Sequence, residues 1–357
     1  MPSKHAVWIL AGLLAATPSM ARTAGGAPPR VTVVDEPFVS TVLADNRIGL
    51  NAERAIKVFL PPGYTKSVRR YPVVYFLHNA WWSPRQMVED GRMQRLLERG
   101  FADGVVKEFI LVAADYTGPT TGSLYENSRV SGRWLDYTVD EVVPLIDRKY
   151  RSLARRENRA VVGDFFGGRG ALKLAMVKAN VFSVAYALHP VAAGTGDVPW
   201  PSVEIDWRRM HAAKTFAELG GLGRTQIFWA IHQAFAPNLA NPPCYCDFYT
   251  ETKDGQPRYN PDRAHAMQAA FLLDETLPVS AAALRTMRGI AFDWGRFDTT
   301  QAHVISNRQF SRMLEDLGVE HEAEEYRGDP FNRTFTDDGR FAKRVLPFLE
   351  KHLVWTE

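Results

Sequence analysis

The fold of this 357-residue chain is decided by one stretch, Asn158-Arg-Ala-Val-Val-Gly163-Asp-Phe165-Phe-Gly167-Gly-Arg-Gly-Ala-Leu-Lys-Leu-Ala-Met176. An apolar, β-branched run is followed by glycines and then by a helical pattern that opens with small residues. Glycines on both sides of such a turn let a strand and a helix approach closely while one side chain points outward. Gly163 and Gly167 have the spacing of the G-x-S-x-G nucleophile elbow, and Phe165 stands where the serine belongs. No other G-x-S-x-G occurs in the chain.

Short apolar runs alternate with helical patterns on both sides of this stretch. Six runs are β-branched or aromatic and are bounded by Gly, Pro or Asp, which is typical of buried strands in a parallel sheet. They span Ala55–Leu60, Val73–Leu77, Phe109–Ala114, Ala160–Gly163, Ser183–Leu188 and Gly289–Phe292. The helical patterns include Tyr137–Tyr150, Arg169–Lys178, His303–Leu317 and Phe341–Leu353. The alternation predicts an α/β fold with a mostly parallel, doubly wound sheet.

The alternation stops between about residues 192 and 280. This part of the chain holds amphipathic helical pieces and a loop over residues 238–261, with no clear strand. An insertion of this length between core strands commonly covers the crevice at the carboxyl ends of a parallel sheet. We therefore expect one domain over residues 35–357 with a helical cap, the alternative being an insertion without a role at the site.

The N-terminus has the pattern of an export signal. Lys4 precedes an apolar run over residues 6–16, and small residues follow as far as Ala21. This pattern predicts a signal peptide over residues 1–21, cleaved after Ala21, because the run is too short to span a bilayer. Residues 22–34 are expected to form a flexible leader. We expect a secreted or periplasmic protein without a membrane span.

The overall charge argues against nucleic acid as a partner. The chain has 43 basic and 40 acidic residues, a formal net charge of +3. Binding to a phosphate backbone needs a concentrated basic face, which this balance does not indicate. The oligomeric state is left open by the sequence.

Several segments resemble one family of esterases. They are Pro72–His78, Tyr125–Tyr137, Val143–Arg151 and Glu325–Pro330, in addition to the elbow. From about Arg54 to its C-terminus the chain is similar to the family that includes esterase D, S-formylglutathione hydrolases, feruloyl esterases and mycobacterial mycolyltransferases. The resemblance implies the α/β-hydrolase fold and a Ser-His-Asp site.

The catalytic positions implied by the resemblance are mostly altered. The serine position holds Phe165, the histidine position falls on Pro330, and only the acid is retained, as Asp298. The family's oxyanion loop has glycines after the histidine of the third strand, whereas Asn79 follows His78 here. Acyl transfer through serine needs hydroxyl, base and acid as a unit, so the sequence predicts that serine-hydrolase chemistry is lost.

Polar and aromatic side chains remain at the carboxyl ends of the predicted strands, where they should meet in one crevice. The candidate catalytic residues are Asp298, Asp164 and His189. The candidate ligand-binding residues are His78, Asn79, Trp81, Trp82, Asp115, Tyr116, Trp134, Phe165, Phe166 and Trp294. No metal site and no cofactor are expected, because single scattered histidines and carboxylates are a weak metal signature.

Three interpretations of this set stay open. The favoured one is a protein that binds a small molecule, either a carbohydrate or an acyl ester, on an aromatic platform of Trp81, Trp82, Tyr116, Trp134 and Trp294. The alternative is a hydrolase or transferase acting on saccharides, in which Asp164 and Asp298 serve as an acid/base pair at a separation of about 5–10 Å. The third is structural, with carboxylates that cap turns and aromatics that fill space. A protein-interaction role has no positive feature in the sequence.

Overall fold

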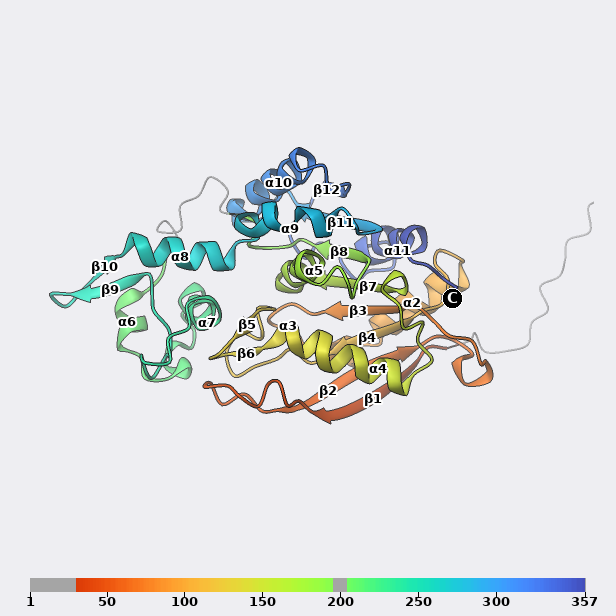
Figure 1. Cartoon of the computed structure of the whole chain (residues 1–357), viewed down its shortest axis with the longest axis horizontal. Coiled ribbons are helices and arrows are strands. Elements are labelled where there is room, and N and C mark those ends of the chain that lie inside the picture. Colours follow the sequence, from red (N-terminus) through yellow and green to blue (C-terminus); the bar gives the residue numbers. More distant parts are fainter. Residues whose placement is uncertain (1–29, 195–203, 357) are drawn as a thin grey trace, which may run out of the picture.

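A computed structural model describes residues 30–194 and 204–356 of the protein (Figure 1). Eight strands form its main sheet in the order β1-β2-β4-β3-β7-β8-β11-β12. Strand β2 is antiparallel to both of its neighbours, and the other neighbouring strands are parallel. The strands are β1 (Thr32–Val39), β2 (Glu53–Leu60), β3 (Val73–Leu77), β4 (Ile110–Ala114), β7 (Arg159–Asp164), β8 (Val184–Leu188), β11 (Gly289–Gly295) and β12 (Glu322–Tyr326). The predicted α/β architecture is confirmed.

Two hydrophobic cores lie on the two faces of this sheet, because successive side chains of a strand point to opposite faces. In β3, Val73, Tyr75 and Leu77 belong to one core, whereas Val74 and Phe76 belong to the other. The first core packs against α3 (Trp134–Asp136), α4 (Val143–Lys149), α5 (Phe166–Val177), α9 (Leu277–Leu284) and α10 (Gln301–Asp316). The second core packs against α1 (Pro84–Glu89), α2 (Arg92–Ala102) and α11 (Leu346–His352).

All six predicted strands are present, but both edge strands of the sheet were missed. Strand β1 begins at Thr32, so residues 32–34 belong to the sheet. The flexible leader expected over residues 22–34 is therefore wrong for its last three residues. These residues form a ladder with β2, which composition alone did not indicate. Strand β12 is rich in glutamate and pairs with a neighbour on one side only, so it lacks the apolar pattern of a buried strand. The predicted signal peptide lies outside the described residues.

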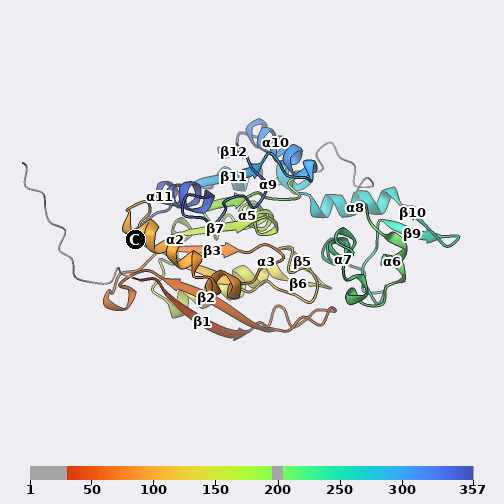
Figure 2. The ribbon, with the colours of Figure 1, turned by 180° about the vertical axis from the view of Figure 1, so that it is seen from behind.

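We refer to the insertion between β8 and β11 as the cap. It contains α6 (Trp207–Ala212), α7 (Arg224–Phe235), a hairpin of β9 (Thr250–Lys253) and β10 (Gln256–Tyr259), and α8 (Pro261–Phe271). Figures 1 and 2 show these elements together beyond the end of the sheet toward which β3 points. The hairpin corrects the expected loop over residues 238–261. Its turn, Asp254-Gly255, has positive φ at both residues, which is a recognisable hairpin signal.

Two further short strands, β5 (Asn127–Ser128) and β6 (Gly132–Arg133), pair with each other beside α7. Helix α9 returns the chain from the cap to the sheet by packing against α5. Across the described ranges, the helices are all too short or too polar to cross a membrane.

Candidate functional site

The nucleophile elbow is built in this chain as the glycine spacing predicts. Phe165 connects β7 to α5 with φ 57° and ψ −108°, a backbone conformation that costs a non-glycine residue about 1–3 kcal/mol. A Cβ atom on Gly163 would lie 1.9 Å from the carbonyl oxygen of Gly167. A Cβ atom on Gly167 would lie 2.0 Å from the carbonyl oxygen of Leu77. The strained turn is therefore retained although the residue at its apex has no nucleophilic atom.

The ring of Phe165 occupies the centre of the site. It stacks on His189 with 5.8 Å between the ring centroids, and Phe331 lies 5.1 Å away on another side. Trp81, at 5.6 Å, and Phe166, at 5.5 Å, complete the aromatic surroundings. Only 8% of the Phe165 surface is exposed, so the ring fills the space around the elbow apex.

The retained acid, Asp298, is held by three hydrogen bonds. Its Oδ2 atom lies 2.9 Å from Nε2 of His189 and 2.8 Å from Nδ1 of His303. Its Oδ1 atom accepts the backbone N–H of Thr300 at 2.7 Å. Burial alone would raise the pKa of this carboxyl, but the hydrogen bonds from His189 and His303 hold the pKa well below its usual range. Asp298 is therefore an ionised acceptor between two imidazoles.

His189 uses both of its ring nitrogens within the fold. Its Nδ1 atom accepts the backbone N–H of Gly295 at 2.9 Å, so the ring proton is on Nε2 and is donated to Asp298. Burial lowers the pKa of His189, which keeps the ring neutral. Side-chain atoms of His189, Asp298 and His303 lie close enough together to hold a metal ion. However, a protonated Nε2 offers no lone pair to a cation, so the donor set does not fit one.

His303 is the functional residue that sequence reasoning missed. It lies in the first turn of α10, five residues after Asp298, and the side chain of His303 is 24% exposed. The histidine position implied by the family resemblance holds Pro330, and the next residue, Phe331, packs against Phe165. In addition to the candidate His189, the site therefore contains a second histidine, which comes from α10. The sequence contained one signal for this residue, since His303 follows Asp298 by five residues at the start of a predicted helix.

A cavity of about 230 Å³ lies between the elbow and the cap helices α7 and α8. Its wall is mostly apolar, with polar groups at Arg224, Thr300 and His303. The other lining residues are Trp81, Phe165, Phe166, Val191, Ala192, Gly194, Ile227, Phe228, Ile231, Phe271, Leu272 and Ala302. Among the candidates named from sequence, Trp81, Phe165 and Phe166 line this cavity.

Asp164 belongs to a different network from Asp298. Its Oδ2 atom accepts a hydrogen bond from the side chain of Asn79 at 3.4 Å, and Oδ1 has no hydrogen-bond partner among the described residues. Burial raises the pKa of Asp164 to about 7, against the opposing charge of Arg340, which is itself paired with Asp293. The two candidate carboxylates, Asp164 and Asp298, therefore belong to separate hydrogen-bond networks.

Four other candidate residues are hydrogen-bonded or ion-paired to neighbouring parts of the fold. His78 donates from Nδ1 to the carbonyl oxygen of Asn79 at 2.8 Å and accepts the backbone N–H of Tyr116 at Nε2, at 3.0 Å. The hydroxyl of Tyr116 is 2.9 Å from that of Thr138. The buried indole of Trp134 donates to Ser131, and Asp115 pairs with Arg54 at 3.6 Å. These residues hold the loops around the elbow and are not part of the cavity wall.

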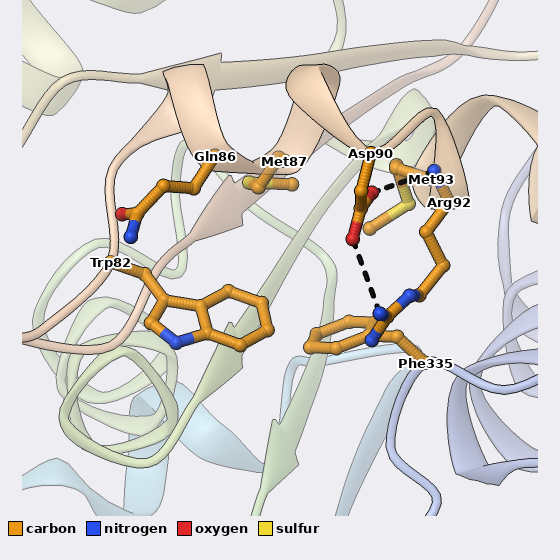
Figure 3. Close-up of a pocket in the computed structure, with 7 residues that line it drawn as sticks. All are labelled: Trp82, Gln86, Met87, Asp90, Arg92, Met93 and Phe335. Carbon is orange, nitrogen blue, oxygen red and sulfur yellow. Dashed lines mark hydrogen bonds and ion pairs between the residues drawn. The ribbon is translucent and has the colours of Figure 1, made fainter.

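The remaining two tryptophans also lie away from the cavity. Trp294 is buried, stacks on Phe292 and donates to Glu325 at 3.0 Å. Trp82 faces a separate groove beside Phe335, with 5.4 Å between the ring centroids (Figure 3). Of the five aromatics expected to form a platform, only Trp81 lines the cavity above Phe165, so that platform is not assembled.

Comparison with known proteins agrees with the fold. Residues 48–236 match the sequence family described as "Putative esterase", which is more than half of the chain. The protein therefore belongs to this esterase family of α/β-hydrolases.

Individual relatives are distant. An endo-1,4-β-xylanase/feruloyl esterase of Xylanibacter ruminicola is 28% identical over 134 residues, which are 35% of this chain and 18% of the relative. An esterase of Mycobacterium tuberculosis is 29% identical over 172 residues, which are 46% of this chain and 34% of the relative. The matched segments thus make up well under two thirds of either relative.

Solved structures share the fold over nearly the whole chain. A ferulic acid esterase superposes with a TM-score of 0.60 at 18% identity, covering 90% of this chain and 98% of that one. An S-formylglutathione hydrolase of Agrobacterium tumefaciens superposes with a TM-score of 0.56 at 14% identity, covering 93% and 99%. The predicted α/β-hydrolase fold is confirmed.

Proposed function

We propose that this chain is an esterase-like protein that binds the acyl part of an ester ligand without carrying out serine-hydrolase chemistry. The proposal rests on Phe165, whose ring occupies the apex at which the family places its hydroxyl. A phenyl ring can neither attack a carbonyl carbon nor release an acyl group. The site that remains is one for recognition.

The cavity above Phe165 supports an acyl or aromatic group as the ligand part bound there. Its wall is mostly apolar, and among the described lining residues the polar side chains besides the indole of Trp81 are Arg224, Thr300 and His303. A volume of about 230 Å³ is at the small end for ligand pockets, so it suits one part of a larger ligand. Because some relatives are named feruloyl esterases, a feruloyl ester is the first ligand to screen.

The carbohydrate part of the proposal rests on the groove beside Trp82. This groove has a volume of about 230 Å³ and combines two aromatic rings, Trp82 and Phe335, with polar groups on Gln86, Asp90 and Arg92 (Figure 3). An aromatic face bordered by hydrogen-bonding groups suits a sugar ring. Trp81 and Trp82 are adjacent residues that line different hollows. We therefore propose an acylated saccharide, with its acyl group above Phe165 and its sugar at Trp82.

The absence of serine chemistry is tested with a fluorophosphonate probe and a p-nitrophenyl ester. We expect no labelled serine and no turnover above the rate without protein. A labelled serine, or turnover that the probe abolishes, would contradict the proposal.

Binding is tested by quenching of tryptophan fluorescence with ethyl ferulate and with a feruloylated oligosaccharide. We expect Trp81→Ala to weaken both ligands by about tenfold or more, since an aromatic contact contributes about 1 kcal/mol beyond its burial. Trp82→Ala should weaken only the oligosaccharide, and Trp355→Ala, at a different groove, should change neither. If Trp81→Ala and Trp355→Ala change the ligand affinities equally, the cavity above Phe165 is not the acyl-binding site.

Export is also part of the proposal, because residues 1–21 have the pattern of a signal peptide. N-terminal sequencing of protein from a periplasmic or culture fraction should find a chain that begins at Arg22. Full-length protein found only in the cytoplasm would contradict it.

A further inference from the structure

We propose that Asp298 and His303 form a working base directed at the elbow apex, with its histidine supplied by α10 instead of the loop after β12. The inference goes beyond ligand binding, since it concerns the proton-accepting capacity of the site. It does not depend on the ligand that the protein binds.

Among the described residues, the hydrogen bonds of His303 leave one ring nitrogen available to the cavity. With the ring neutral, Nδ1 donates to Oδ2 of Asp298 at 2.8 Å, and Nε2 is then the nitrogen that carries a lone pair. His303 lines the cavity and lies edge-on to Phe165, with 5.6 Å between the ring centroids. An imidazole oriented by an ionised carboxylate on one nitrogen, with a lone pair on the other, is the arrangement that a general base requires.

The neighbours of Asp298 keep this pair in place. The backbone N–H of Thr300 binds the second carboxylate oxygen at 2.7 Å, and His189 donates to the same oxygen as His303. His189 is committed on both nitrogens and completely buried, so it serves as a positioning residue. His303 is therefore the histidine of the two that can exchange a proton with a group in the cavity.

The apex position is still arranged for a reacting side chain. Phe165 keeps a positive φ, and the flanking glycines keep the close approach of β7, β3 and α5. A smaller residue at position 165 would inherit this backbone and open the space beside His303. In a Phe165→Ser variant, the hydroxyl proton would pass to Nε2 of His303 while Oγ bonds to the phosphorus of a fluorophosphonate. Fluoride would leave with the electron pair of the P–F bond.

The test compares fluorophosphonate labelling of Phe165→Ser with that of three matched variants. We expect labelling of Phe165→Ser and none of Phe165→Ala. Adding His303→Gln to Phe165→Ser should slow labelling at least 100-fold, the usual contribution of a general base. Adding His265→Gln, at an exposed residue of α8, should leave the rate unchanged. Equal rates with and without His303, or no labelling of a folded Phe165→Ser protein, would overturn the proposal.

A second readout uses Phe165→Cys and the pH dependence of its alkylation by iodoacetamide. A thiol beside a histidine base ionises below its usual pKa of about 8.5. We expect a lowered apparent pKa that returns to the usual value when His303→Gln is added. The buried Cys244 and Cys246 are subtracted by measuring the natural chain. An unshifted pKa in Phe165→Cys would contradict the proposal, and ligand binding by the natural chain would be unaffected by that outcome.

Discussion

The imidazole of His303 lies edge-on to the ring of Phe165, at an interplanar angle of 86°. The apolar residue that replaces the nucleophile is thus packed directly against a histidine bound to the retained acid. An acid–histidine pair therefore lies beside an aromatic ring at the elbow apex. The proposed ligand site is built on the ring of Phe165, and the proposed base is the imidazole of His303 that touches it.

Replacing Phe165 with glycine should cost less stability than replacing it with alanine. Removing a buried ring costs about 3 kcal/mol, so both Phe165→Ala and Phe165→Gly should destabilise the fold. Because the residue has φ 57° and ψ −108°, glycine avoids strain that alanine keeps. We expect Phe165→Gly to be more stable than Phe165→Ala by about 1 kcal/mol in urea unfolding. The reverse order would show that the elbow is not strained.

The elbow glycines should not accept a methyl group. In Gly167→Ala the new Cβ would lie 2.0 Å from the carbonyl oxygen of Leu77, a backbone atom that cannot move away cheaply. We expect a loss of about 4 kcal/mol or more, or failure to fold. Gly118→Ala, where the nearest atom is 3.8 Å away, serves as the control and should stay within about 1 kcal/mol of the parent. Similar thermal midpoints for the two variants would contradict the close packing described for the elbow.

Asp164 should make the fold less stable as the pH rises. Its folded pKa of about 7 lies above the unfolded value of about 4, so between these values the folded chain holds a proton that the unfolded chain has lost. Stability from this group is therefore present at low pH and is lost as the pH rises toward 7. We expect Asp164→Asn to gain about 2–4 kcal/mol relative to the parent between pH 4 and pH 8.

The matched control for this pH effect is Asp298→Asn, which should behave in the opposite sense. The pKa of Asp298 is lowered, so its contribution is present at neutral pH and fades only as the pH falls below about 4. Urea unfolding of the parent and both variants across the pH range measures the two differences. A pH-independent difference for Asp164→Asn would contradict its raised pKa.

Arg169 should connect the elbow helix to the cap. This fully buried side chain of α5 donates to the carbonyl oxygen of Phe271, at the end of α8, at 2.8 and 3.0 Å, and to that of Leu124 at 3.2 Å. Arg169→Met leaves these carbonyls without their buried donor and removes one of the two cations that pair with the carboxylate of Glu126, so we expect a loss of about 3–5 kcal/mol.

Limited proteolysis should then cut the cap of Arg169→Met faster than that of the parent. Lys173→Met removes a neighbouring cation from the same carboxylate without touching the carbonyls, and it should cost about 1 kcal/mol. If the two variants lose equal stability, the hydrogen bonds to the cap contribute little.

The parts predicted from sequence are those specified by neighbouring residues. The six inner strands could be predicted because a buried strand carries its apolar run in consecutive residues. The elbow could be predicted because its close contacts demand glycine at two fixed positions. Strands β1 and β12 were missed because an edge strand pairs on one side only and can be polar, so it lacks the apolar run of a buried strand.

The site was predicted less completely, since proximity there depends on the fold. His189 and Asp298 are 109 residues apart, yet their side chains share a hydrogen bond. The sequence likewise did not indicate that the side chain of Asn79 donates a hydrogen bond to Asp164, 85 residues further along the chain. Trp81 and Trp82 were placed on one platform, whereas adjacent residues of a loop line different hollows.

The sequence by itself determined that the elbow exists and that Phe165 stands at its apex, because a residue identity at a glycine-flanked turn needs no distant partner. Only the tertiary structure decided which side chains surround that ring. It brought His189, 109 residues away in the chain, to the acid Asp298, and it placed His303 against the ring of Phe165. The physical reason is that short-range geometry follows from covalent neighbours, whereas these two contacts require separate elements of the fold to meet.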